Sequence, residues 1–141
     1  MKQNIILNTA RKVIFLALFT VSLIASETNM QVFQPPASSC PKSWFTDMEE
    51  IVDKVDVITL MSVKNLKKDI GIPKEIQSCN TSLMGDYVFE GNVPLQAIKD
   101  FLKRKPLNTI GLALPAYEND KEVKTVYLLN EGGTYKEFGK Y

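Results

Sequence analysis

Three segments of the chain place apolar residues at helical spacing. The first begins at Trp44 and runs toward Val55, with acidic side chains on the opposite side. The second begins near Ser62, a suitable N-cap, and continues to Ile70. The third begins at Pro94, which suits the first turn of a helix. We therefore predict three helices, and Gly71, Pro73 and Pro106 provide the expected ends of the second and third.

Short apolar and β-branched runs lie between these segments and predict strands. A Gly-Asp turn separates two of them and predicts a hairpin, and the Asn-Glu-Gly-Gly stretch at 130–133 predicts a second hairpin near the C-terminus. The expected strands cover residues 30–33, 55–60, 81–84, 87–90, 110–114, 124–129 and 134–138.

The order of these elements indicates the fold class. A helix between two strands favours a right-handed crossover with parallel pairing. Strand, helix and strand, followed by a hairpin and a helix, is the thioredoxin-like order. We expect an α/β protein with a small mixed sheet flanked by helices and an added C-terminal hairpin. In this arrangement the loop before the first helix lies beside the loop before the third strand, and these loops carry Cys40 and Cys79.

The N-terminus has the layout of a secretory signal peptide. Basic residues precede an uncharged, mostly apolar run at 13–25, which ends in Ala25-Ser26. We therefore expect a signal peptide at 1–26, a Pro/Ser-containing arm at 27–39, and a single thioredoxin-like domain at 40–141. The run is short for a bilayer span, and a retained anchor is the alternative.

Charge and cysteine content narrow the function classes. The chain has 17 Lys+Arg and 16 Asp+Glu; removal of 1–26 takes three basic residues and leaves 14 against 16, a formal charge of −2. This balance argues against nucleic-acid binding. Two lysine-rich clusters, Lys64/Lys67/Lys68 and Lys99/Lys103–Lys105, are interpreted as solvated helix faces. After export, Cys40 and Cys79 are expected to form a disulfide bond. The chain-entropy model gives such a bond a stabilising contribution of roughly 4 kcal/mol.

Two motifs carry a resemblance to a known family. Ser78-Cys79-Asn80-Thr81 and the segment from Glu90-Gly91-Asn92 to Val93-Pro94, with a cysteine-bearing loop before Trp44, resemble the thioredoxin-like, periplasmic, copper-resistance-associated family called CopG-type. The matched pieces cover most of the chain after residue 39. The resemblance implies that the family's metal ligands correspond here to Ser38, Cys40, Pro41, Cys79, Asn80 and Asn92.

Most of these positions lack a copper ligand. Copper selects thiolate, thioether and imidazole groups, and this chain contains no histidine. We predict a degenerate member with no cofactor and no metal, in which the two remaining sulfurs bond to each other. A copper-resistance protein that binds copper through Cys40 and Cys79 alone is the alternative.

Enzymatic functions have weaker support. Thiol–disulfide exchange usually needs two close cysteines at a helix start, and no Cys-x-x-Cys is present. Without histidine, no Ser-His or Cys-His pair exists for hydrolysis. Carboxylates such as Asp86 and Glu90 are expected to be solvated.

The sequence thus predicts a non-enzymatic, structural or partner-binding protein of the periplasm. No small-molecule substrate is evident, and we expect protein partners in the bacterial cell envelope, such as a subunit of a secretion complex, with association to the outer membrane through them. The arm at 27–39 and the C-terminal hairpin are the candidate interfaces, because tyrosine is favoured at interfaces. The same tyrosines could instead cover the core; they are Tyr127, Tyr135 and Tyr141.

Overall fold

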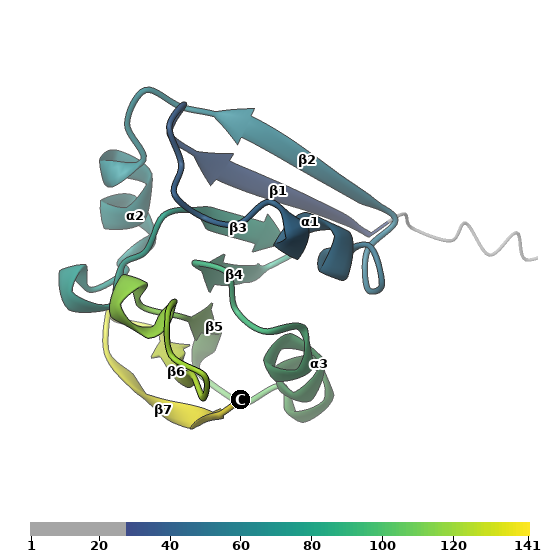
Figure 1. Ribbon diagram of the computed structural model, residues 1–141. Helices are drawn as coiled ribbons and strands as arrows, with labels where there is room; N and C mark the ends of the chain where they lie inside the picture. The colour runs from purple at the N-terminus through teal and green to yellow at the C-terminus, as the bar shows by residue number, and fades with distance from the viewer. Residues whose placement is uncertain (1–27) are drawn as a thin grey trace, which may run out of the picture.

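The computed structural model describes residues 28–141, and the expected signal peptide at 1–26 lies outside the described residues. No helix within residues 28–141 is long and apolar enough to cross a membrane. The elements, shown in Figure 1, are β1 (Asn29–Gln34), α1 (Ser43–Met48), β2 (Lys54–Thr59), α2 (Lys64–Ile70), the 3-10 helix η1 (Lys74–Ile76), β3 (Thr81–Met84), β4 (Tyr87–Glu90), α3 (Leu95–Arg104), β5 (Thr109–Ala113), the 3-10 helix η2 (Ala116–Glu118), β6 (Thr125–Asn130) and β7 (Tyr135–Lys140).

All seven strands form one mixed sheet in the order β2-β1-β3-β4-β5-β6-β7. Strand β1 pairs in parallel with β2 and antiparallel with β3, and β3 and β4 form the expected hairpin. These four strands with α1, α2 and α3 make the thioredoxin-like core. The expected C-terminal hairpin of β6 and β7 extends this core sheet, because β5 pairs in parallel with β4 and antiparallel with β6.

The sheet buries apolar residues on both faces. The larger cluster joins Trp44 and Met48 of α1 and Phe101 of α3 to residues of the central strands. The smaller cluster joins Ile72 and Ile76, which follow α2, to strand residues of the opposite pleat. Helices α1 and α3 therefore cover one face and the α2–η1 segment covers the other, which gives three layers.

The strand expected at 30–33 is present as β1, but the segment that contains it is not a peripheral arm. Residues 29–34 of the segment expected as an arm form β1, between β2 and β3 in the interior of the sheet, and Met30 and Val32 are fully buried. The Pro/Ser stretch that follows is a loop leading to Cys40, as expected. The domain expected at 40–141 thus includes β1.

Helix α1 is also shorter than its apolar pattern suggested. It ends at Met48, and the chain turns at residues 49–51 before β2 begins at Lys54. Ile51 and Val52 still pack against the large core cluster from this turn. Their helical spacing therefore reflected burial on one side of the chain and not a continued helix.

The sheet register places several strand ends at one level. Phe33 pairs with Thr81, Thr81 pairs with Glu90, and Glu90 pairs with Ala113. The loops that follow β1, precede β3, and follow β4 and β5 therefore meet at the same edge of the sheet. The two family-like motifs lie in this group of loops.

Candidate functional site

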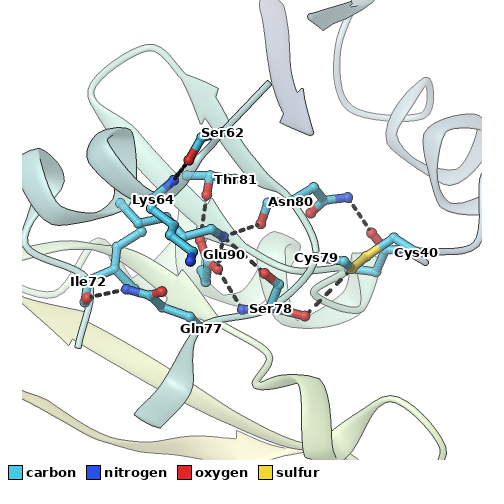
Figure 2. A network of polar contacts seen from close by, with 12 residues as sticks. Cys40, Ser62, Lys64, Ile72, Gln77, Ser78, Cys79, Asn80, Thr81 and Glu90 are labelled. Carbon is cyan, nitrogen blue, oxygen red and sulfur yellow. Dashed lines mark hydrogen bonds and ion pairs between the residues drawn. A yellow bond between two sulfur atoms is a disulfide. The ribbon is translucent and has the colours of Figure 1, made fainter. Parts of the chain in front are cut away.

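A disulfide bond between Cys40 and Cys79 joins the loop before α1 to the loop before β3. The two Cα atoms lie 5.7 Å apart, within the usual range for a bridge. Cys40 is buried at 6% exposure, and Figure 2 shows the bridge beside Ser78 and Asn80. The fold thus brings together the two cysteine loops as the thioredoxin-like order predicted.

Asparagine side chains continue the contact between these loops. The Asn80 amide nitrogen donates to the Asn92 side-chain oxygen at 2.9 Å, and the Asn92 amide nitrogen donates to the Pro41 carbonyl at 3.0 Å. Because the Pro41 carbonyl can only accept, Asn92 must turn its nitrogen toward it and its oxygen toward Asn80. Both amide orientations are therefore fixed by one backbone group.

The six positions matched to the family's ligands gather in this amide and disulfide cluster. Cys40 and Cys79 bond to each other, and Asn80, Asn92 and Pro41 form the amide chain. Ser38 remains local, because its hydroxyl accepts the Cys40 backbone N–H at 3.3 Å. Residues far apart in sequence are thus assembled as a ligand set would be, but they bind one another.

One acceptor in this cluster is left without a partner among the described residues. Asn80 is fully buried, and its side-chain oxygen makes no hydrogen bond; the hydroxyl of the nearby Ser82 is in the same condition. An unsatisfied buried oxygen typically costs about 1–3 kcal/mol. The buried side-chain oxygen of Asn80 is therefore a destabilising feature of this cluster.

A second polar network lies on the other side of Cys79, around the carboxylate of Glu90. Lys67 and the Ser78 backbone N–H donate to one carboxylate oxygen, and the Thr81 hydroxyl donates to the other at 2.6 Å. The Lys67 ammonium also donates to the carbonyls of Ser78 and Asn80 at 3.1 and 3.5 Å. Both ionic side chains are almost wholly buried, at 3% and 0% exposure. Figure 2 shows the carboxylate of Glu90 between the Ser78 and Thr81 contacts.

The protonation of Glu90 is balanced between opposing effects. Burial raises the pKa of the Glu90 carboxyl above its ordinary value, while the Lys67 ammonium and the hydrogen bonds from Lys67, Thr81 and Ser78 lower it. The net direction of the pKa is upward. Removing Lys67 would therefore raise this pKa further.

Two sequence interpretations are wrong at this network. Lys67 was expected on a solvated helix face but is buried at 2% exposure, and Glu90 was expected to be solvated but is fully buried. Lys64 and Lys68, the neighbours of Lys67, are exposed as expected. The helical pattern of α2 could not reveal the inward lysine, because its partner lies 23 residues further along the chain. A glutamate that ends a buried strand was the only available signal.

Glycine and tryptophan fix the backbone around both networks. Gly91 has φ +76°, and a Cβ there would lie 2.5 Å from the Leu114 carbonyl oxygen and 2.7 Å from the Ser78 Cβ. The Trp44 indole donates to the Val93 carbonyl at 2.7 Å from the buried face of α1. The close approach of the loops at 78–80, 91–93 and 114 therefore requires glycine at position 91.

The donor set at this site does not fit a copper centre. Its two sulfurs are used in the disulfide, and the remaining positions supply neutral amides, a hydroxyl and a proline. Nowhere in residues 28–141 do three His, Cys, Asp or Glu side chains gather so that they could hold a metal ion. The arrangement can instead fix three loops relative to one another.

A hollow of about 400 Å³ borders the amide chain, lined in part by Pro41 and Asn92. Asp120 and Lys124 also line it. The Lys124 ammonium is held in place, because it donates to the carbonyls of Glu118, Asn119 and Lys121. One side of the hollow is therefore formed by a lysine side chain that three hydrogen bonds fix.

Comparisons with known proteins agree with the motif analysis. Residues 76–118 match a family model described as "Protein of unknown function, DUF411". A solved structure titled "Copper resistance protein copG- Form 2" is similar at 23% identity and a TM-score of 0.68, covering 82% of this chain and 99% of that chain. The corresponding Form 1 structure gives 20% identity and a TM-score of 0.64, covering 82% and 98%. No curated protein matches the chain.

At these identities the two structures show the shared fold alone. The matched family model covers the Cys79-Asn80-Thr81 motif and the Glu90 to Pro94 motif. The match over these two motifs and the shared fold agree with the resemblance that the motifs indicate.

Proposed function

We propose that this chain is a non-enzymatic, exported protein whose thioredoxin-like frame acts as a structural or partner-binding component of the bacterial cell envelope. The Asn80–Asn92–Pro41 chain is the observation that carries this proposal. Positions that resemble metal ligands are occupied by groups that hydrogen bond to one another. A site so arranged holds loops in place and leaves the molecular surface for recognition.

The chemistry of the described residues supports a non-enzymatic role. The chain has no histidine, and its two sulfurs are joined. The fully buried carboxylate of Glu90 is already occupied by donors from Lys67, Ser78 and Thr81. Its evident task is to hold the loop that carries Cys79.

The candidate interfaces change in light of the fold. Because β1 is an interior strand, only the loop at 35–39 remains of the expected arm. In the C-terminal hairpin, Tyr135 packs on the smaller core cluster and Tyr141, which follows β7, packs on the larger one. Tyr127 stands edge-to-face with Tyr135 at 5.6 Å. These tyrosines thus cover the core in part.

An exposed tyrosine adjoins this group. Tyr117 is 56% exposed. Its pKa is raised to about 12, mainly by a hydrogen bond with Tyr127. An accessible aromatic ring held by its neighbour is a feature of protein interfaces. We include it in the proposed partner-binding surface.

Affinity capture from detergent-solubilised envelope tests this proposal. We expect the tagged chain to recover a stoichiometric partner that an unrelated exported protein with the same tag does not recover. A secretion complex of the envelope is one assembly in which such a subunit would serve, with contact to the outer membrane through its partners. Recovery of the free monomer alone would contradict the proposal.

Copper binding by the reduced chain is the second candidate, and one observation favours it. Reduction would leave two thiols on Cα atoms 5.7 Å apart, and two thiolates suffice for linear Cu(I). Competition against a chromophoric Cu(I) chelator under reducing conditions decides it. We then expect stoichiometric binding that is absent from the Cys40→Ser/Cys79→Ser variant, and equal behaviour of the two proteins would eliminate this candidate.

A further inference from the structure

A hollow on the α2 side of the sheet concentrates positive charge. Its volume is about 710 Å³, and Lys64 and Lys68 of α2 line it together with Lys74 of η1. The other lining residues are Asn65, Gly71, Ile72, Pro73, Gln77 and Gly133, so no carboxylate is among them. We call these three lysines with Ile72 and Pro73 the lysine groove.

The three lysines of the groove are not paired within residues 28–141, although exposed Asp69 and Glu75 follow two of them in the sequence. Their three ammonium groups make no ion pair there, whereas Lys67, Lys99 and Lys121 pair with Glu90, Glu50 and Glu118. The three groove lysines are also exposed. On a chain with a small net charge, this grouping leaves a local positive field directed to solvent.

The groove is held in shape by the segment that joins α2 to η1. Gly71 ends α2 in the left-handed conformation at φ +87°. The Gln77 amide nitrogen donates to the Ile72 carbonyl at 2.9 Å and fixes the intervening loop, a contact visible in Figure 2. Buried Ile72 and half-buried Pro73 give the groove an apolar portion beside its charges. The shape therefore exists before a ligand binds.

We propose that the lysine groove binds an acidic, partly apolar peptide segment of a partner protein. Lys64 and Lys68 lie one turn apart on α2, so their Cβ atoms are about 6 Å from each other. Carboxylates at alternate positions of an extended peptide repeat at about 6.6–6.8 Å, which matches that spacing. Lys74 adds a third cation from another element, and Ile72 and Pro73 receive a neighbouring apolar side chain.

The groove suits carboxylates better than phosphates. Phosphate sites commonly combine arginine forks or the N–H groups at a helix start with the bound oxygens, and no arginine lines this groove. An apolar portion would also gain nothing from a bare inorganic anion. This inference rests on the proposed partner-binding function and names the surface and the chemistry of the partner.

Peptide binding tests the inference directly. The probe is a short fluorescein-labelled peptide of alternating glutamate and leucine, titrated with the full-length chain and followed by fluorescence anisotropy. We expect binding that weakens at high salt, and that falls about tenfold or more in K64Q/K68Q/K74Q. The matched control is K42Q/K103Q/K136Q, which removes the same charge from exposed sites outside the groove and should bind as the wild type does.

Three results would overturn the inference. They are equal weakening in both triple variants, equal binding of a peptide with glutamine in place of glutamate, and groove-dependent binding of inorganic tripolyphosphate without binding of the peptide. Unfolding midpoints of both variants should match that of the wild type, because none of the six side chains makes a hydrogen bond or ion pair within residues 28–141.

Envelope capture with the same variants separates this inference from the proposed function. A partner that the wild type captures and K64Q/K68Q/K74Q loses supports the groove. A partner that both retain keeps the proposed function and overturns the groove as its surface. Failure of the wild type to capture any partner counts against the proposed function itself.

Discussion

The two polar networks that flank Cys79 differ in charge, burial and completeness. On one side, Lys67 and Glu90 form a buried ion pair in which the carboxylate accepts from three residues. On the other side, Asn80 and Asn92 form a neutral chain that reaches Pro41 and leaves one oxygen unsatisfied. The charged network positions the loops, and the neutral network occupies the positions that resemble metal ligands. In this chain the same loops are therefore held by two networks of different chemistry.

The largest expected effect comes from Lys67→Met. It leaves the Glu90 carboxylate buried without its cation and removes the contacts to Ser78 and Asn80, and we expect a loss of about 3–5 kcal/mol in the free energy of unfolding near neutral pH. Urea denaturation measures it. The loss should shrink on acidification, because the raised pKa of Glu90 then lets the folded state take up a proton before the unfolded state does.

A double variant provides the control for that experiment. Lys67→Met combined with Glu90→Gln removes both charges while an amide remains for Ser78 and Thr81. It should recover a large part of the lost stability, since replacing a whole buried pair is tolerated better than breaking it. Equal destabilisation of the single and double variants would show that the charges themselves are not what the loops depend on.

Removing the bridge between the two networks should have the next largest effect. Cys40→Ser/Cys79→Ser removes a disulfide bond between residues 39 positions apart in the sequence. We expect the free energy of unfolding to fall by about 2–4 kcal/mol. Chemical denaturation of the variant and of the reduced wild type should give similar values. An unchanged midpoint after reduction would mean that the amide and ionic contacts alone hold the loops.

The neutral network should contribute less. Asn92→Ala removes the acceptor of the buried Asn80 amide, and we expect thermal or urea unfolding to show a loss of about 1–2 kcal/mol. The matched amide deletion is Gln96→Ala, at an exposed helix position where the side chain bonds to Asp100. It should change stability by under about 0.5 kcal/mol. A loss at position 92 as large as that of Lys67→Met would remove the distinction between the two networks.

The smallest effect concerns an ion pair outside both networks. The hydrogen bond from Lys121, followed by that from the Thr125 backbone, lowers the pKa of Glu118. Its stabilising contribution is therefore present above the unfolded pKa and is lost as the pH falls through the lowered folded pKa. Because Lys121 is half exposed, Lys121→Gln should reduce stability by at most about 1 kcal/mol at neutral pH and by less in acid, as urea denaturation at several pH values would show. A loss of stability in Lys121→Gln that becomes larger in acid would contradict the expected direction of this pH dependence.

Much of the frame was predictable because its signals are local. The Gly85-Asp86 turn and the Gly132-Gly133 turn each mark a hairpin that the structure contains. The pairing of Cys40 with Cys79 followed from the order of elements, since that order places their loops side by side.

The interior of the site was not predictable in the same way. Lys67 lies between exposed neighbours on the helix surface, and its inward direction depends on a carboxylate in a distant strand. Asn80 and Asn92 flank the predicted hairpin of β3 and β4, but nothing local to either residue indicates that their side chains bond to each other. The central position of β1 was underestimated because the adjacent Pro/Ser stretch has the composition of a loop.

Gly91 has a consequence for how sites of this kind change. Its neighbour Asn92 is half-buried and makes its contacts through the side chain, so another side chain could replace it without moving the backbone. Any side chain at position 91 would collide with Leu114 and Ser78. An exchange of the side chain at position 92 therefore leaves the backbone scaffold in place, whereas loss of the glycine at position 91 would dismantle it.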